Sequence, residues 1–210
     1  MRRGAALCDG KRPVWRHLRA LRSALRSRSA DRKINLRIIG ASALLLQARY
    51  ERGTKDGDIL ETGDLDVETK ARLLALAGPG TDLSRRHGLY IEFVASGLPL
   101  LPQAPMWLEL AELNGQLAHF RIEVLTVVDV VVSKLKRLHG NDLRDIEAMI
   151  DLDLVPHAVL IERFRSAVDC FLLDARAEDL PKYIENLHRV ERDLFGTPQT
   201  EIDLPDWLGG

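Results

Sequence analysis

LRIIGASALLLQA, residues 36–48, joins a short apolar run to an Ala- and Leu-rich segment through a glycine. The run Leu36 to Ile39 favours a strand, and the segment Ala41 to Ala48 favours a helix. A strand that turns through Gly40 into a helix directs free backbone N–H groups and the positive end of a helix dipole to one point, which suits a phosphate. Small residues at such turns also serve packing, so the turn alone is a weak signal of a site.

RGTKDGDIL, residues 52–60, follows after a polar loop and predicts a second strand over Thr54 to Leu60 that carries Asp56 and Asp58. Alternation along a strand places both carboxylates on one face. Two carboxylates that close repel each other unless a cation lies there. Hard oxygen ligands on a strand suit Mg²⁺ bound together with the phosphates of a substrate. Asp-x-Asp also occurs at 64/66 and 151/153, where we expect a helix start and an interhelical loop.

Strand and helix patterns continue to the middle of the chain. Asp64 is expected to cap a helix that ends near Ala77, because residues 78–80 read Gly-Pro-Gly. A strand is expected over Tyr90 to Ala95. Residues 108–113 and 117–125 alternate in polarity on either side of Asn114-Gly115, which predicts a hairpin with a type I′ turn.

The second half of the chain is helical in pattern. Thr126 is expected to cap a helix that runs to about Leu138, with Asp129 completing a capping box. A second helix follows Asn141, and helical patterning continues from 156 to about 195 with a break near Pro181. The sequence therefore predicts an α/β (α+β) protein. The expected ranges are a basic N-terminal helix at 1–33, an α/β core at 34–125, a helical region at 126–195 and an acidic tail at 196–210.

Composition limits the class of protein. The chain has 210 residues, 46% hydrophobic residues and a net charge of -1, as ordinary globular proteins do. No apolar run approaches the ~18 residues that a membrane span needs, and no apolar stretch follows the basic N-terminus as in a secretory signal. We therefore expect a cytoplasmic protein with no membrane partner. The sequence has no P-loop, no zinc-ligand spacing and no nucleophile elbow.

Positive charge is concentrated at the N-terminus. Residues 1–33 contain eleven Lys or Arg and two acids, and Val14 to Arg28 has the apolar spacing of an amphipathic helix. This helix is either a solvated charged face docked by its leucines or a surface that follows the phosphates of RNA or DNA.

In order and spacing, these segments resemble the nucleotidyltransferases of the DNA polymerase β superfamily, and within it the AbiEii-type toxin nucleotidyltransferases and their uncharacterised relatives. That family has a glycine-led turn into a helix, then R-x-T-x-D-x-D on a strand and an acid on a neighbouring strand. A helix with a lysine and a K/R-D-x-x-D segment follow. The matching positions here are 40–44, 52–58, Glu92, 133–137 and 141–146, within a resemblance that covers residues 34–150.

The resemblance implies a mixed sheet with flanking helices, and transfer of a nucleoside monophosphate from an NTP to an acceptor with release of pyrophosphate. Asp56 and Asp58 would hold two Mg²⁺ ions together with the NTP. Glu92 would complete the metal site on the nucleophile side and accept the proton of the acceptor hydroxyl. Ser42 and the N–H groups of the Gly40 turn would hold the distal phosphates.

Further residues take supporting roles by the same resemblance. Lys134 would reach a phosphate, with an outward-facing solvated lysine as the alternative. Arg52 and Thr54 would shape the loop and the start of the strand. A charge network between the two following helices is expected of Arg137, Asp142 and Asp145.

Two functional classes remain open. The first is a nucleotidyltransferase that modifies an RNA end, for example of tRNA, or a protein, in a toxin–antitoxin or phage-defence setting with an antitoxin as partner. The second is an inactive module of the same fold that binds nucleotide, RNA or a protein. If the two acidic strands are neighbours, alternation predicts that Asp56, Asp58 and Glu92 converge on one open pocket near Gly40 and within reach of Lys134.

Overall fold

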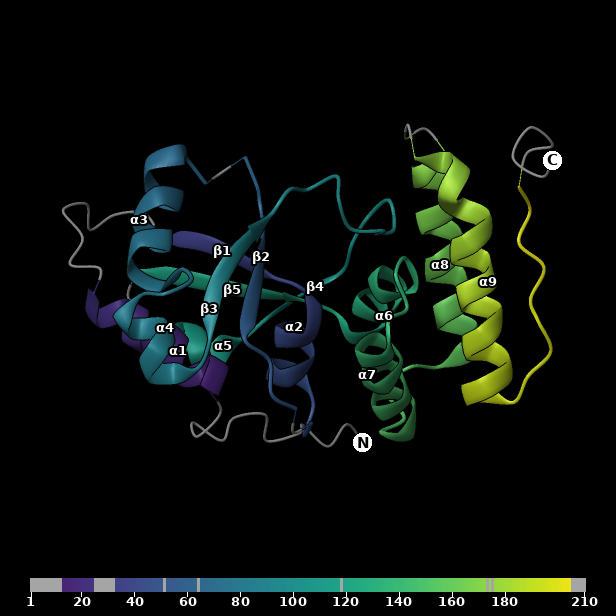
Figure 1. The fold of residues 1–210 in the computed structure, drawn as a ribbon, viewed down its shortest axis with the longest axis horizontal. Coiled ribbons are helices and arrows are strands. Elements are labelled where there is room, and N and C mark those ends of the chain that lie inside the picture. The colour runs from purple at the N-terminus through teal and green to yellow at the C-terminus, as the bar shows by residue number, and fades with distance from the viewer. Residues whose placement is uncertain are drawn as a thin grey trace. The chain divides into compact units, whose positions relative to one another are not determined.

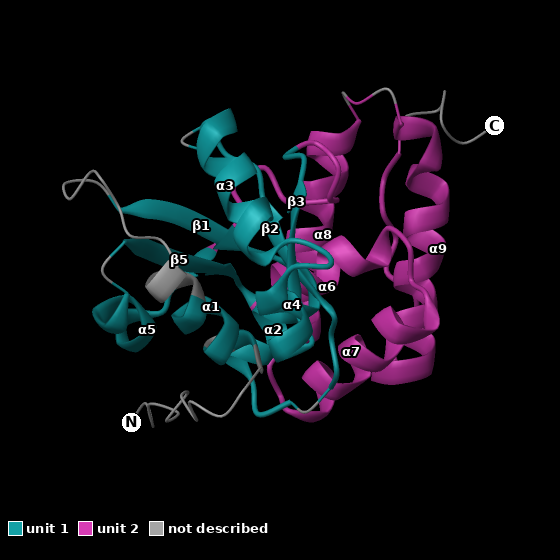
Figure 2. Ribbon diagram, turned by 60° about the vertical axis from the view of Figure 1, so that its left-hand side comes forward, with its two compact units in different colours: residues 1–96, 107–126 teal, residues 97–106, 127–210 magenta. Residues whose placement is uncertain are grey.

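The chain passes through two compact units and enters the second before the first is complete. The computed structural model describes residues 13–24, 33–50, 52–63, 65–117, 119–172, 174 and 176–204. Unit 1 comprises 1–96 and 107–126, and unit 2 comprises 97–106 and 127–210 (Figure 2). Unit 1 thus differs from the predicted α/β core at 34–125 in two ways: it includes residues 1–33, and it leaves the segment 97–106 to unit 2.

A five-stranded mixed sheet with the order β3-β2-β1-β5-β4 forms the centre of unit 1 (Figure 1). The strands are β1 (Ile34–Ile38), β2 (Asp56–Leu60), β3 (Tyr90–Val94), β4 (Trp107–Glu109) and β5 (Phe120–Leu125). β1 pairs antiparallel to β2 and parallel to β5, β2 pairs parallel to β3, and β4 pairs antiparallel to β5. The apolar residues Leu36 and Ile38 are buried in β1, which explains its central position in the sheet.

Helices pack against this sheet as the apolar pattern requires. They are α1 (Pro13–Ala24), α2 (Gly40–Gln47), α3 (Val67–Ala77), α4 (Asp82–His87) and α5 (Ala111–Gln116). α2 packs on β2 and β5, α3 on β3 and α4, and α5 on β5. The predicted turn from β1 into α2 and the predicted end of α3 at Gly78 are confirmed. The cap of α3 is Asp66, whose side chain accepts a hydrogen bond from the Thr69 N–H, whereas Asp64 lies outside the described residues.

The hairpin predicted at Asn114-Gly115 is wrong in its turn, although β4 and β5 do pair. Both residues lie in α5. The buried amide of Asn114 accepts from the Ile122 N–H at 2.7 Å and donates to the Ile122 carbonyl at 3.1 Å. These bonds satisfy the backbone of β5 as a neighbouring strand would. Asn114 therefore lies in a helix and pairs with β5 through its side chain, and it does not form a tight turn.

The basic helix α1 is docked on unit 1 by its apolar face, where it packs on α2, α3 and α4. Val14 and Leu18 are each 3% exposed, as the amphipathic pattern predicts, while Leu21 and Leu25 lie outside the described side chains. His17 on the same helix is fully buried, and neither of its ring nitrogens has a hydrogen-bond partner among the residues that the structure describes. Its ring meets that of His87 edge to face, with 5.8 Å between the centroids.

Unit 2 is helical, as the sequence predicts. It contains α6 (Val127–Leu135), α7 (Gly140–Asp151), α8 (His157–Phe171), the 3-10 helix η1 (Ala177–Asp179), α9 (Leu180–Val190) and the π-helical turn η2 (Glu191–Phe195). Throughout the described segments, no helix has both the length and the apolar character needed to cross a membrane.

The capping box predicted for Asp129 is wrong. This carboxylate is fully buried and accepts two hydrogen bonds of 2.7 Å from the Arg163 guanidinium and a third, also 2.7 Å, from the Met106 N–H. The same guanidinium donates to the Ala104 carbonyl at 2.9 Å. A buried charge requires such partners, and here they connect α6, α8 and the segment 97–106 within unit 2.

Candidate active site

Gly40 and Asp58 meet where β1 turns into α2. Gly40 has φ +64°, and a Cβ built on it would overlap the Oδ2 atom of Asp58. The Ile39 N–H donates to the Asp58 carbonyl at 2.9 Å, which fixes the backbone of β2 beside the turn. The N-cap residue of α2, Ile39, makes no capping hydrogen bond through its side chain. Glycine is therefore required here for both its backbone conformation and its missing side chain, and the Asp58 carboxylate lies against the turn.

Asp56 is held by two hydroxyl groups. Thr54 Oγ1 donates to the Asp56 carboxylate at 2.8 Å, and Ser42 Oγ donates to the Asp56 carbonyl at 2.8 Å. Ser42 is fully buried in α2, so its hydroxyl ties α2 to β2. In this structure Ser42 thus acts as a positioning residue for Asp56, while its predicted contact with phosphates stays a prediction.

The strand register places the third acid beside the first two. β2 and β3 are neighbours, with Asp58 opposite Glu92 and Asp56 opposite Tyr90. Residues opposite each other in a parallel pair project from the same face, so all three carboxylates share one face of the sheet. Asp56 and Asp58 are half-buried and Glu92 is exposed. On the other face, Ile59 and Ile91 are buried as alternation predicts.

Tyr90 completes this group; alternation predicts that it shares the face of Glu92, but the sequence does not single it out as a site residue. Burial raises the pKa of its phenol, and the negative charges of Asp56, Glu92 and Asp58 raise it further. The three carboxylates are thus close enough to act on one hydroxyl group. An aromatic residue two positions before the acid on the same strand face was the available signal.

Arg37 brings a cation to the same face. It stands opposite Leu60 in β2, two residues beyond Asp58, and therefore projects with the aspartates. Its Nε donates to Glu123 at 3.0 Å, and its guanidinium lies 4.9 Å from the ring centroid of Trp107. The sequence shows Arg37 only as an interruption of an apolar strand, because its partners come from β4 and β5.

The donor set suits a hard cation. Three carboxylates on one face of two neighbouring strands supply only oxygen ligands, which Mg²⁺ prefers. Among the described residues, no three His, Cys, Asp or Glu side chains are already gathered around a metal position. The geometry therefore brings the three acids to one face but does not gather them at one point.

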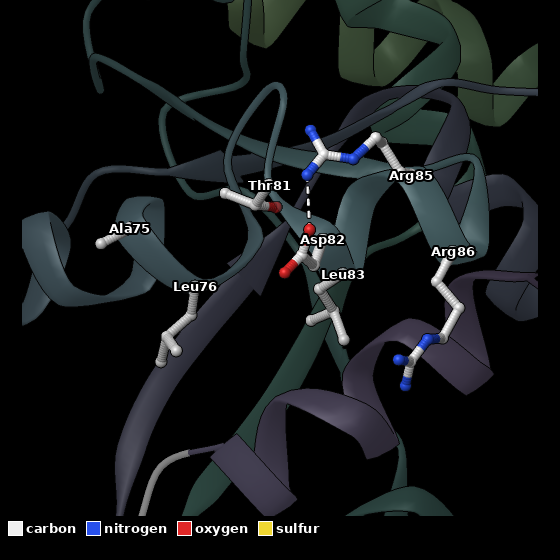
Figure 3. Close-up of a pocket in the computed structure, with 7 residues that line it drawn as sticks. All are labelled: Ala75, Leu76, Thr81, Asp82, Leu83, Arg85 and Arg86. Carbon is white, nitrogen blue, oxygen red and sulfur yellow. Dashed lines mark hydrogen bonds and ion pairs between the residues drawn. The ribbon is translucent and has the colours of Figure 1, made fainter.

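Of the remaining predicted residues, Arg52 is half-buried in the loop that leads to β2, and its role in shaping that loop stays a prediction. A cavity of about 480 Å³ in unit 1 lies elsewhere, between α3 and α4 (Figure 3).

Lys134 lies in unit 2 and is buried. Its ammonium lies 2.8 Å from Asp142 Oδ1 and 2.8 Å from Asp145 Oδ2, so it joins α6 to α7. The alternative of an outward-facing solvated lysine is wrong. The network expected of Arg137, Asp142 and Asp145 is present, but Lys134 is its central cation and Arg137 lies 3.8 Å from Asp142 at its exposed edge.

Comparison with known families agrees with this architecture. A family model described as "Nucleotidyltransferase of unknown function (DUF6036)" matches residues 16–172, about three quarters of the chain. No curated protein and no solved structure matches the chain.

Proposed function

We propose that this chain, which belongs to the family of nucleotidyltransferases of unknown function, transfers a nucleoside monophosphate from an NTP to a hydroxyl acceptor. The chain has the mixed sheet and flanking helices of that fold. One observation carries the proposal. Asp56, Asp58 and Glu92 share one face of the sheet beside the Gly40 turn.

Each residue has a physical role in this reaction. Asp56 and Asp58, with Glu92, would hold Mg²⁺, which supplies neutralisation of the triphosphate charge when bound. Thr54 and Ser42 hold Asp56 in place. The N-terminus of α2, whose N-cap residue Ile39 makes no side-chain capping hydrogen bond, would bind the distal phosphates through backbone N–H groups. Glu92 is exposed and would accept the proton of the acceptor hydroxyl.

Lys134 has no phosphate role in this proposal, because its ammonium already contacts two carboxylates. The acceptor is an RNA end or a protein side chain. The resemblance to AbiEii-type toxins is what supports a role in a toxin–antitoxin or phage-defence system.

Binding and transfer test the proposal separately. Calorimetric titration with each of ATP, GTP, CTP and UTP in the presence of Mg²⁺ should show binding that Asp58→Asn abolishes. Asp151→Asn is the matched control, because it makes the same change in an exposed Asp-x-Asp pair of unit 2. Unchanged nucleotide affinity in Asp58→Asn would refute the site.

Transfer is read by incubating the protein with each α-labelled NTP, Mg²⁺ and either total RNA or cell lysate. Label in RNA or in a protein supports the enzyme and identifies its acceptor. Binding that depends on Mg²⁺ and Asp58 without label in any acceptor assigns the chain to the inactive, nucleotide-binding alternative.

A further inference from the structure

Two helices that are far apart in the sequence bring exposed arginines together on unit 1. α1 packs directly on α4. The exposed arginines of this surface, which we call the α1–α4 arginine face, are Arg16, Arg19, Arg85 and Arg86. α1 has no acidic residue, and the only one in α4 is Asp82. The face is therefore strongly positive in a protein whose net charge is -1.

The charges on this face differ in how far they are neutralised. Arg85 pairs with Asp82, and Arg19 donates to the Gln116 side-chain oxygen. Arg16 and Arg86 have no hydrogen bond or ion pair with any described residue. Two unpaired guanidinium groups on one surface are available to phosphates, to which arginine binds in a bidentate manner.

The positive charges of Arg16 and Arg86 both act on the imidazole of His87. Burial lowers the pKa of its imidazole, and the positive charges of Arg86 and then Arg16 lower it further. Cations from both helices therefore combine their fields at the junction between α1 and α4. Such summed positive potential attracts anions over a longer range than either residue would alone.

A cavity opens beside the arginines. It has a volume of about 480 Å³ and is bordered by α3 and α4. Its lining residues are Ala75, Leu76, Thr81, Asp82, Leu83, Arg85 and Arg86 (Figure 3). Arg85 extends over Asp82, and Arg86 points away from that pair (Figure 3). The volume is within the usual range for small-molecule sites of about 300–1,000 Å³, and the wall combines apolar side chains with cations.

We propose that the α1–α4 arginine face binds single-stranded nucleic acid, with the backbone phosphates on Arg16 and Arg86 and one unstacked base in the cavity between α3 and α4. A duplex cannot offer that base without breaking a pair, whereas a single strand turns its bases outward at little cost. This inference rests on the proposed function in one respect, since it names the acceptor class as nucleic acid.

Its test needs neither NTP nor divalent cation, so its failure leaves NTP transfer intact. Fluorescence anisotropy with labelled 12-nucleotide RNA, the same DNA strand and the DNA duplex is measured over a range of salt concentrations. Binding of either single strand more tightly than the duplex supports the proposal, and the comparison of RNA with DNA shows whether the 2′-hydroxyl contributes. Asp151→Asn, which changes an exposed acid of unit 2, should bind RNA as the unmodified protein does.

The arginines are tested by Arg16→Gln/Arg86→Gln. Loss of two phosphate contacts should flatten the salt dependence by about 1.4 in log–log slope, which corresponds to about 25-fold weaker binding at 0.1 M salt. Arg189→Gln/Arg192→Gln is the matched control, because it removes equal charge from exposed positions in unit 2. An equal slope in both variants would overturn the proposal, as would no binding at 20 mM salt.

The cavity is tested independently of charge. Ala75 lies on its wall and is exposed, so Ala75→Trp fills the space without removing a core contact. We expect weaker single-strand binding with an unchanged salt slope. Unchanged affinity in Ala75→Trp would exclude the cavity as the site for a base.

Discussion

Acidification should weaken unit 1 through His17. Its ring is fully buried without a hydrogen-bond partner among the described residues, and burial followed by the neighbouring His87 lowers its pKa from 6.5 to about 4. The folded state thus holds this imidazole neutral. Below pH 6.5 the His17 imidazole is protonated in the unfolded chain but stays neutral in the folded chain. The free energy of unfolding therefore falls as the pH drops from about 6.5 to about 4 and then levels off.

The size of the effect follows from the two pKa values. Their separation corresponds to about 3 kcal/mol once the pH lies below both. Between about pH 8 and pH 5, where the folded form still excludes the proton, the expected loss in the free energy of unfolding is about 2 kcal/mol.

Urea unfolding followed by circular dichroism at the two pH values measures this loss. His17→Phe keeps an aromatic ring against His87 and removes the titration, so it should lose about 2 kcal/mol less stability on acidification than the unmodified protein. His119→Gln is the control, because it removes a histidine that is half-buried in another part of unit 1. An equal loss in His17→Phe and the unmodified protein would refute the reasoning.

Two further substitutions examine the buried charges and the turn. Lys134→Met leaves two buried carboxylates without their cation and should lower the free energy of unfolding by about 3–5 kcal/mol, whereas replacing Lys134, Asp142 and Asp145 together by apolar residues should restore most of it. Urea unfolding measures both variants. If the free energy of unfolding of Lys134→Met lay within about 1 kcal/mol of that of the unmodified protein, the importance of the ion pairs between Lys134 and the two carboxylates would be contradicted. Gly40→Ala should cost about 1–3 kcal/mol at φ +64° and displace Asp58, which would weaken Mg²⁺-dependent NTP binding in calorimetry. Gly53→Ala is the control and should bind nucleotide normally, because an added methyl group there meets nothing within 4 Å. Equal nucleotide affinities in Gly40→Ala and Gly53→Ala would show that the Gly40 turn is not part of the nucleotide site.

Local periodicity predicted the parts of the fold that depend on neighbours in the chain. The turn from β1 into α2 and the shared face of Asp56 and Asp58 both follow from residues within a few positions of each other. The family resemblance predicts an acid on a neighbouring strand, parity predicts that Glu92 shares the face of the aspartates, and the register of Glu92 with Asp58 confirms both.

Long-range contacts explain the errors. Asn114-Gly115 has the composition of a tight turn, but the amide of Asn114 is used by Ile122 on β5. Asp129 has the spacing of a capping box, but its partner Arg163 lies 34 residues away on α8. Nothing within one helix reveals a partner of this kind, because packing alone brings the two groups together.

The interleaving of the two units has a consequence for how the gene can be divided. A ribosome releases residues 97–106 before β5, so the piece that accepts hydrogen bonds from Arg163 is made before the sheet of unit 1 is complete. A fragment that ends at 126 carries the segment 97–106 of the helical unit without its helices. A fragment that begins at 127 leaves Arg163 without the Ala104 carbonyl. A division of the gene at that junction would therefore separate groups that interact within unit 2.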